Sequence, residues 1–275
     1  MRMSNLVRRL ALVAAGIGTA VVAPTAHAGT PATTPSAPSL LVNTNPSGMW
    51  AYDGIYVGGA VWTGTTSLLQ STFGTHLGST SSLLDLPTML QYDALWVDQR
   101  YQSAPQAAEL ANLLTYAATG RRVVIVGENA TWGPWNAAIL GALGGSEGPL
   151  QSDYGVGCNY GPAYTVTHNA LTAGVASVNM TCGGYAVGGT ALFDYNVATL
   201  WGPKQNVLTL LDANVFDDRF ISTGGAQFRQ NVVSWAAAPR DVAANVAAVP
   251  EPATVALVGG GLLTLGAAVR RRRDG

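Results

Sequence analysis

Tyr92-Asp93-Ala94-Leu95-Trp96-Val97-Asp98 is an apolar run that ends in an acid, and it decides the fold together with Arg122-Val123-Val124-Ile125-Val126-Gly127. Both runs predict strands, and the second is apolar on both faces, as in a parallel strand that is covered on each side. Between them the sequence predicts a helix with Ser103 as its N-cap, Pro105 in its first turn and Gly120 after its end. Its apolar positions have helical spacing: Ala107, Leu110, Leu113, Leu114 and Ala117. The segment is therefore a β–α–β unit.

The flanking sequence extends this pattern. Residues 206–212 predict another strand, and 227–237 predict a closing helix that packs Phe228, Val232 and Trp235. Upstream, a helix is predicted over 65–73. The first strand is either Gly54–Gly58 or Leu40–Val42, and the sequence alone leaves both open.

Residues 151–200 are rich in glycine and aromatic residues, and 164–168 alternate in polarity, which predicts β-hairpins at an edge of the sheet. The expected domain, 40–238, is a doubly wound, mostly parallel α/β domain of the flavodoxin-like kind with a β-rich insertion at about 151–200. Thr63-Gly64-Thr65-Thr66 is similar to the phosphate loop of flavodoxins, but a threonine-rich helix cap is the simpler interpretation.

The amino-terminal segment has the features of a secretory signal peptide. Arg2, Arg8 and Arg9 precede an apolar stretch from Leu10 to Ala23, and Ala26-His27-Ala28 is a small-x-small cleavage site. We expect the translocon to export the chain and signal peptidase to remove residues 1–28. Residues 29–39 then form an extended leader that is rich in proline and threonine.

The carboxyl-terminal segment has three parts in a fixed order. Pro250-Glu251-Pro252 is followed by 17 uncharged residues, 253–269, and then by Arg270, Arg271, Arg272 and Arg273. The apolar run predicts a short transmembrane helix whose arginines hold the C-terminus in the cytoplasm. After a linker, 239–249, residues 250–275 resemble the PEP-CTERM sorting signal. The resemblance implies processing by an exosortase and transient anchoring in the inner membrane, then release to the cell surface or the exterior.

Charge excludes one class of partner. Residues 29–248 hold 7 basic and 13 acidic residues, a net charge of −6, because seven arginines of the chain lie in the two signals. So few cations cannot hold a phosphate backbone, which excludes nucleic acid. A low-charge surface rich in Gly, Ser, Thr and Asn suits glycans, and exopolysaccharide is the candidate partner.

The chain has two cysteines, Cys158 and Cys182, both in the exported part. An even pair in an oxidising compartment predicts a disulfide. On the chain-entropy model it would stabilise the fold by roughly 3 kcal/mol.

The core resembles a class I glutamine-amidotransferase-like domain in residues 92–98, 120–129, 168–175 and 231–235. Enzymes of that family carry a nucleophilic cysteine in a Gly-x-Cys-x-Gly elbow after a strand. Here the comparable strand end is Gly127-Glu128-Asn129, without a thiol. The exported part has only two histidines, His76 and His168, which are too few to indicate another kind of catalytic site. We therefore predict no catalytic residue.

Acids end three predicted parallel strands: Asp98, Glu128 and Asp212. They should converge at the carboxyl edge of the sheet, with Asn129, Asn214, Asp217 and Asp218 in adjoining loops. Such a group could hold calcium or sugar hydroxyls, or it could bind loop N–H groups in a structural role. The sequence thus predicts a non-catalytic exported surface or matrix protein. The alternative is a secreted hydrolase or a glycan- or calcium-binding module that uses these acids, and no other cofactor is expected.

Overall fold

The computed structural model describes residues 37–44, 54–100, 103–129, 132–148, 161–211 and 213–239. The predicted signal peptide, most of the leader, and the sorting signal lie outside these residues. None of the helices formed by these described residues combines the length and the apolar character that a membrane span requires.

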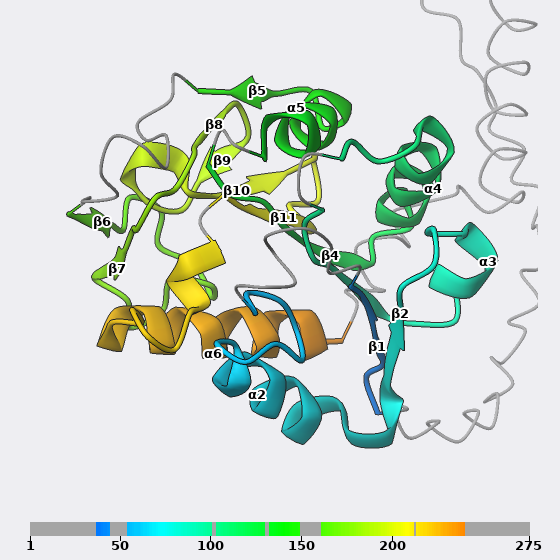
Figure 1. Cartoon of the computed structure of the whole chain (residues 1–275), viewed down its shortest axis with the longest axis horizontal. Helices are drawn as coiled ribbons and strands as arrows, with labels where there is room; N and C mark the ends of the chain where they lie inside the picture. The colour runs from blue at the N-terminus through cyan, green and yellow to red at the C-terminus, as the bar shows by residue number, and fades with distance from the viewer. Residues whose placement is uncertain are drawn as a thin grey trace, which may run out of the picture. The chain divides into compact units, whose positions relative to one another are not determined.

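A seven-stranded sheet lies at the centre of the domain, in the order β2-β1-β3-β4-β11-β10-β9 (Figure 1). Its first five strands are parallel: β2 (Leu77–Thr80), β1 (Leu40–Asn43), β3 (Ala94–Val97), β4 (Arg122–Val126) and β11 (Val207–Leu210). This order is the flavodoxin-like one, with the topological switch point between β1 and β3. The prediction of a large, mostly parallel sheet in an α/β domain is confirmed.

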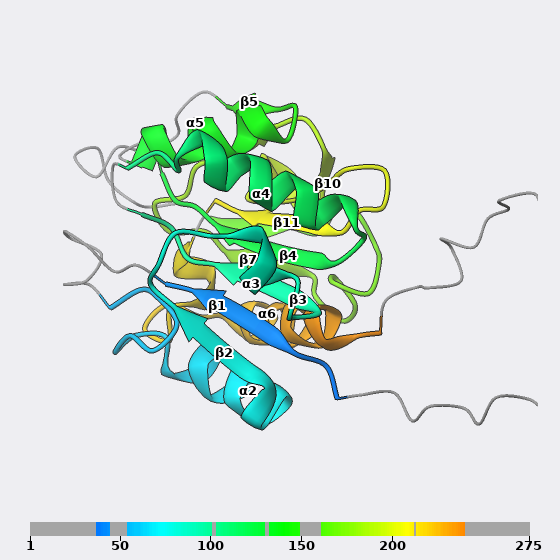
Figure 2. The ribbon, with the colours of Figure 1, turned by 90° about the vertical axis from the view of Figure 1, so that its right-hand side faces the viewer.

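Helices cover both faces of the sheet (Figures 1 and 2). The helices α2 (Thr63–Phe73) and α6 (Thr223–Ala237) lie on one face. The opposite face carries α3 (Leu86–Met89), α4 (Ala107–Ala118) and α5 (Gly133–Ala142). Because successive strand residues point to opposite faces and both faces are covered, β1, β3, β4 and β11 are buried along their whole length or nearly so.

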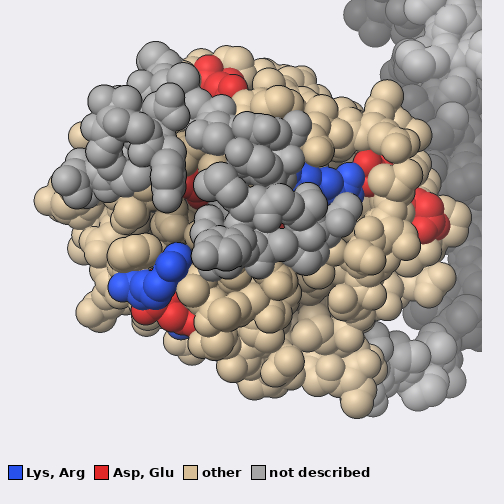
Figure 3. All heavy atoms as spheres, in the orientation of Figure 1, with Lys and Arg blue, Asp and Glu red and all other residues tan. Residues whose placement is uncertain are grey.

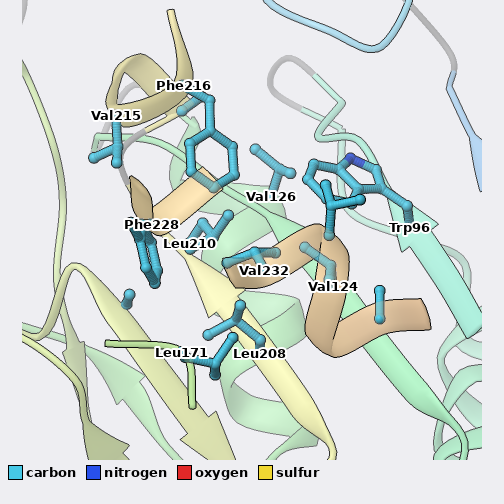
Figure 4. Close-up of a cluster of buried hydrophobic side chains, with 14 of the residues drawn as sticks. Trp96, Val124, Val126, Leu171, Leu208, Leu210, Val215, Phe216, Phe228 and Val232 are labelled. Carbon is cyan, nitrogen blue, oxygen red and sulfur yellow. The ribbon is translucent and has the colours of Figure 1, made fainter. Parts of the chain in front are cut away.

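Two apolar clusters hold these layers together. On the α2/α6 face, Phe228 and Val232 of α6 pack against Trp96, Val124 and Leu208 of the strands (Figure 4). On the other face the cluster contains Leu41, Leu95, Val123, Ile125, Leu113, Tyr116, Ile139 and Leu140. Aromatic rings add directional contacts in the first cluster, where Trp96 lies 6.2 Å from both Trp62 and Phe216. Each such pair contributes about 0.5–1.5 kcal/mol beyond burial.

The β-rich region both extends the main sheet and forms small sheets of its own. Strands β9 (Thr190–Ala191) and β10 (Ala198–Trp201) pair antiparallel at the β11 edge. Strand β6 (Pro162–Tyr164) pairs with β7 (Ser177–Asn179), and β5 (Ser146–Glu147) pairs with β8 (Ala186–Val187), in two separate two-stranded sheets. The described residues also form three short 3-10 helices: η1 (Gly74–His76), η3 (Asp194–Asn196) and η4 (Ala213–Phe216).

Of the two candidates for the first strand, the structure has Leu40–Asn43, whereas 54–58 form a turn in which Gly54 and Gly58 have positive φ. The predicted starts of three helices were wrong. Helix α4 begins at Ala107 with Gln106 as N-cap instead of Ser103, because the Glu109 carboxylate accepts a hydrogen bond from the Gln106 N–H. Helix α6 begins at Thr223 rather than at 227, and α2 begins at Thr63 rather than at 65.

The predicted apolar face of α4 was also wrong in part. Leu113 is buried, but Leu114 is exposed, and Glu109 and Tyr116 occupy the other buried positions. Strand β2 was not predicted, because its four residues include one large apolar side chain and lie at an edge of the sheet.

Candidate functional site at the carboxyl edge of the sheet

Asp98 follows β3 and lies beside the switch point. Its side chain is buried, and each carboxylate oxygen accepts a hydrogen bond: Oδ2 from the Val57 N–H at 3.0 Å and Oδ1 from Trp96 Nε1 at 2.9 Å. Burial raises the pKa of Asp98 to about 6, although both hydrogen bonds act in the opposite direction. Asp98 therefore ties the turn at 54–58 to the sheet.

Glu128 follows β4 and is equally buried, with 1% of its surface exposed. Its Oε2 accepts from the Ala213 N–H at 3.0 Å, and its Oε1 accepts from the Asn129 and Asn214 side-chain amides at 3.3 Å. The Asn214 amide also donates to the Thr181 carbonyl at 2.8 Å. Glu128 thus joins the end of β4 to η4 and to the β-rich region.

The tight turn after β4 explains how Glu128 reaches this position. A Cβ atom at Gly127 would lie 2.6 Å from Asn136 Oδ1 and 2.7 Å from Leu211 Cδ2, so a side chain at 127 would displace one of them. The Asn136 amide in turn donates to the Glu128 carbonyl at 2.7 Å. Where the amidotransferase-like pattern has its thiol elbow, this chain has a carboxylate that is turned into the interior.

The acids of the adjoining loop, Asp217 and Asp218, also lie at this edge, but each forms an ion pair with a different arginine. Asp217 is fully buried and pairs with Arg219 at 2.5 Å. Asp218 accepts hydrogen bonds from the Gly64 N–H and the Thr63 hydroxyl, both at 2.8 Å, and pairs with Arg229 at 2.6 Å. Burial acts to raise the pKa of Asp218, but these hydrogen bonds outweigh it and lower the pKa.

This arrangement decides between the two interpretations of 63–66. The Asp218 carboxylate occupies the N-terminus of α2, the position that a phosphate would take in a flavodoxin-like loop. A Cβ atom at Gly64 would also lie 2.5 Å from the Arg229 guanidinium. The segment is therefore a helix start that the chain's own carboxylate caps.

A buried ion pair at this edge was missed by the sequence reasoning. Arg100 donates to both carboxylate oxygens of Glu109 at 2.8 and 2.9 Å and to Asn43 Oδ1 at 3.1 Å. Its guanidinium lies 5.5 Å from the centre of the Trp135 ring. Burial acts to raise the pKa of Glu109, but hydrogen bonds from Arg100, Leu84 and Gln106 lower it. The available signal was an acid at the third position of α4, where a capping-box carboxylate is expected.

Asp212 and Cys158 lie outside the described residues, so the third acid and the pairing of Cys158 with Cys182 stay predictions. His76 and His168 are exposed. Within 37–239, less the gaps, no three His, Cys, Asp or Glu side chains form a group that could hold a metal ion. The calcium prediction included Asp212 and is therefore untested.

Several solved structures are similar to the domain at low sequence identity. The mmIFT52 N-terminal domain matches with a TM-score of 0.54 and 12% identity over 71% of this chain and 99% of that domain. A protein described as a GMP synthase component from Thermoplasma acidophilum has a TM-score of 0.47 and 11% identity, over 76% and 98% of the two chains. A ThuA-like protein from Bacteroides uniformis has a TM-score of 0.47 and 14% identity, over 78% and 98%. At 12% identity, the match to the mmIFT52 N-terminal domain shows a common fold alone.

No curated protein sequence matches the chain. One family model does match, over residues 248–273, and it describes the PEP-CTERM protein-sorting motif. These residues contain the Pro-Glu-Pro, the apolar run and the four arginines. The chain is therefore an exported protein that exosortase sorts through a membrane-anchored signal at its C-terminus.

Proposed function

We propose that the protein is a non-catalytic component of the cell surface or extracellular matrix. Residues 253–269 span the inner membrane until exosortase acts at the Pro-Glu-Pro, and the arginines keep the C-terminus in the cytoplasm. The motif match at 248–273 supports this route. The translocon and signal peptidase act before it, at residues 1–28.

The burial and the hydrogen bonds of the strand-end acids Asp98 and Glu128 support the non-catalytic role. A general acid, general base or nucleophile must come within hydrogen-bonding distance of a substrate. Asp98 and Glu128 are each 1% exposed, and their oxygens accept hydrogen bonds from N–H groups of neighbouring loops. These contacts favour a structural role, in which the acids hold the carboxyl-edge loops in place.

The surface supports a polysaccharide partner. On the face in Figure 3, most described atoms belong to uncharged residues, and the few cations lie next to acids. Proteins bind neutral polysaccharides through hydroxyl and aromatic contacts rather than through charge. A surface with few charges can provide such contacts. We also propose that a Cys158–Cys182 disulfide stabilises the exported domain, as two cysteines in an oxidising compartment predict.

Replacing Glu128 separates the structural role from a ligand-binding role. We expect Glu128→Gln to lower the free energy of unfolding by about 1–3 kcal/mol, because the Ala213 N–H then loses a charged acceptor. Millimolar calcium should leave the melting temperatures of both proteins unchanged. Asp93→Asn, which alters an acid at the opposite edge that is hydrogen-bonded to Ser39, is the matched control.

Two results would overturn the proposal. A calcium-dependent rise in the wild-type melting temperature that disappears in Glu128→Gln would identify a cation site. Hydrolysis of a glycan or amide that is lost in Glu128→Gln but kept in Asp93→Asn would identify an enzyme.

A further inference from the structure

A small pocket lies where the edge strand β2 and its neighbour β1 meet α3 (Figure 1). Its cavity volume is about 150 Å³. The floor is apolar and consists of Leu41, Leu84 and Met89, which belong to the cluster on the α3/α4/α5 face. Three hydroxyl groups and one carboxylate also line the cavity: Thr80, Ser82, Thr88 and Asp85. We call this cavity the β2 pocket.

The loop that forms the polar side of the β2 pocket is held by buried groups. The Asn43 amide donates to the Ser82 carbonyl at 2.9 Å, and Asn43 Oδ1 accepts from Arg100. The Leu84 N–H donates to Glu109 Oε1 at 3.1 Å. The buried Arg100–Glu109 pair therefore holds the loop at Ser82 through Asn43 and at Leu84 directly. Because the loop is already ordered, a ligand does not bear the entropic cost of ordering it.

The polar groups of the pocket can both donate and accept hydrogen bonds. Ser82 and Asp85 are exposed. The Thr80 hydroxyl accepts from the Ser82 N–H at 3.1 Å and keeps its own proton to donate. Asp85 Oδ1 accepts from the Thr88 N–H at 3.0 Å, and a carboxylate has further acceptor positions. Donors and acceptors together are what the hydroxyl groups of a sugar require.

Size and charge narrow the class of ligand. A cavity of about 150 Å³ admits one six-membered ring, since an engineered cavity of that volume binds benzene, whereas sites for cofactors and drug-sized ligands have about 300–1,000 Å³. The hydrogen bond from the Thr88 N–H lowers the pKa of Asp85, which is therefore ionised at neutral pH. Of the described residues that line the pocket, Asp85 alone is charged, so anions are repelled. One exposed carboxylate attracts a cation only weakly, because water and salt screen it.

We propose that the β2 pocket binds one neutral hexose unit of a polysaccharide. The C–H face of the sugar ring packs on the apolar floor, and its hydroxyl groups form hydrogen bonds with Thr80, Ser82 and Asp85. Leu83, which also lines the pocket and is 50% exposed, contacts the adjoining sugar unit. This inference rests on the polysaccharide partner of the proposed function and adds the place at which the domain holds it.

The test measures sugar binding by ligand-observed NMR, on the full chain without its signal peptide in a sugar-free detergent. The probes are glucose, galactose and mannose, and we expect at least one of them to bind with a Kd on the order of millimolar, as suits a ligand of about twelve heavy atoms. Ser82→Phe puts a ring into the pocket and should weaken binding at least about tenfold. Ser81→Phe, in the same exposed loop but outside the pocket lining, is the matched control and should bind as the wild type does.

A second variant avoids the bulky side chain. Asp85→Asn keeps a good N-cap for α3 but loses the charge, so it should bind about threefold to tenfold more weakly. Equal melting temperatures of Ser82→Phe and Ser81→Phe show that a loss of binding is not a loss of folding. Binding of none of the three hexoses, unchanged binding by both pocket variants, or tighter binding of glucosamine than of glucose would overturn the assignment.

Co-sedimentation with exopolysaccharide purified from the producing cells is scored separately. If the wild type and Ser82→Phe bind this polysaccharide equally, the partner of the proposed function stands and the β2 pocket is wrong as its site. If the wild type does not bind it, the proposed partner itself is wrong. Binding that is lost in Ser82→Phe and kept in Ser81→Phe supports both.

Discussion

Arg100→Met is expected to lower the free energy of unfolding by about 3–5 kcal/mol, because it leaves a carboxylate buried without its cation. Glu109 is 3% exposed and receives two hydrogen bonds from the Arg100 guanidinium. The Leu84 and Gln106 N–H groups, both at 3.1 Å, would then be its remaining partners. The substitution also removes the contact with Trp135 and the hydrogen bond to Asn43. Chemical denaturation of the purified domain measures the loss.

Two further variants test this explanation. Arg229→Met breaks a more exposed pair, in which the side chains are 15% and 28% exposed, and should therefore cost less. The double variant Arg100→Met/Glu109→Leu removes both charges and should be more stable than Arg100→Met alone. A loss below about 1 kcal/mol in Arg100→Met would show that the buried pair does not stabilise the domain.

Stability should depend on pH through Asp98. Its pKa is about 6 in the folded protein and 3.8 for an ordinary aspartate carboxyl in water, so the folded state binds the proton more tightly. The resulting stabilisation is complete below pH 3.8 and is lost as pH rises through 6. The shift corresponds to roughly 3 kcal/mol. Asp98→Asn removes this titration, so the wild-type stability relative to the variant should fall by most of that amount between pH 4 and pH 7.

The comparison with the variant isolates Asp98 from the other acids. Asn can accept from one of the two N–H donors but not replace both oxygens, which adds an offset that does not vary with pH. Asp218→Asn is a control of opposite sign: its pKa is lowered, so its stabilising contribution is lost as pH falls. If the difference between wild type and Asp98→Asn is constant from pH 4 to pH 7, the burial of a titrating carboxyl at this position is wrong.

The central strands could be predicted because their sequence leaves no alternative. Residues 123–126 and most of 207–210 are apolar on both faces, and a parallel strand that is covered on each side buries them fully. The first strand could not be chosen, because 54–58 and 40–42 are both short and apolar. The choice depends on Gly54 and Gly58, whose positive φ values form a turn.

The start of α6 shows a different limit. Ser222 is its N-cap and accepts from the Gly225 N–H, but Gly224 and Gly225 in the first turn hide a helical pattern. A Cβ atom at Gly224 would lie 2.0 Å from the Ser177 carbonyl oxygen, so close contact with β7 explains the glycine. Tertiary packing therefore requires glycine at position 224, although glycine has a low helix propensity.

At the candidate site, sequence predicted the positions but not the partners. The flavodoxin-like order puts Asp98 and Glu128 at one edge, as the strand ends indicated. The backbone N–H groups that donate to them, those of Val57 and Ala213, however, lie 41 and 85 residues away in the chain. No local pattern reveals that these N–H groups occupy the carboxylates. An acid at the end of a strand, in one sequence taken by itself, therefore predicts where a site could lie. It does not predict whether the carboxylate is accessible to a ligand.

Exosortase sorts this exported protein through residues 248–273. This sorting is tested by measuring the intact mass and the cell fraction of the protein from cells with and without exosortase. With exosortase, the protein should lack residues 1–28 and the segment after the Pro-Glu-Pro, and it should be found outside the inner membrane. Without exosortase, it should keep its C-terminal helix and stay in the membrane fraction. The same mass and the same fraction in both cells would contradict this sorting.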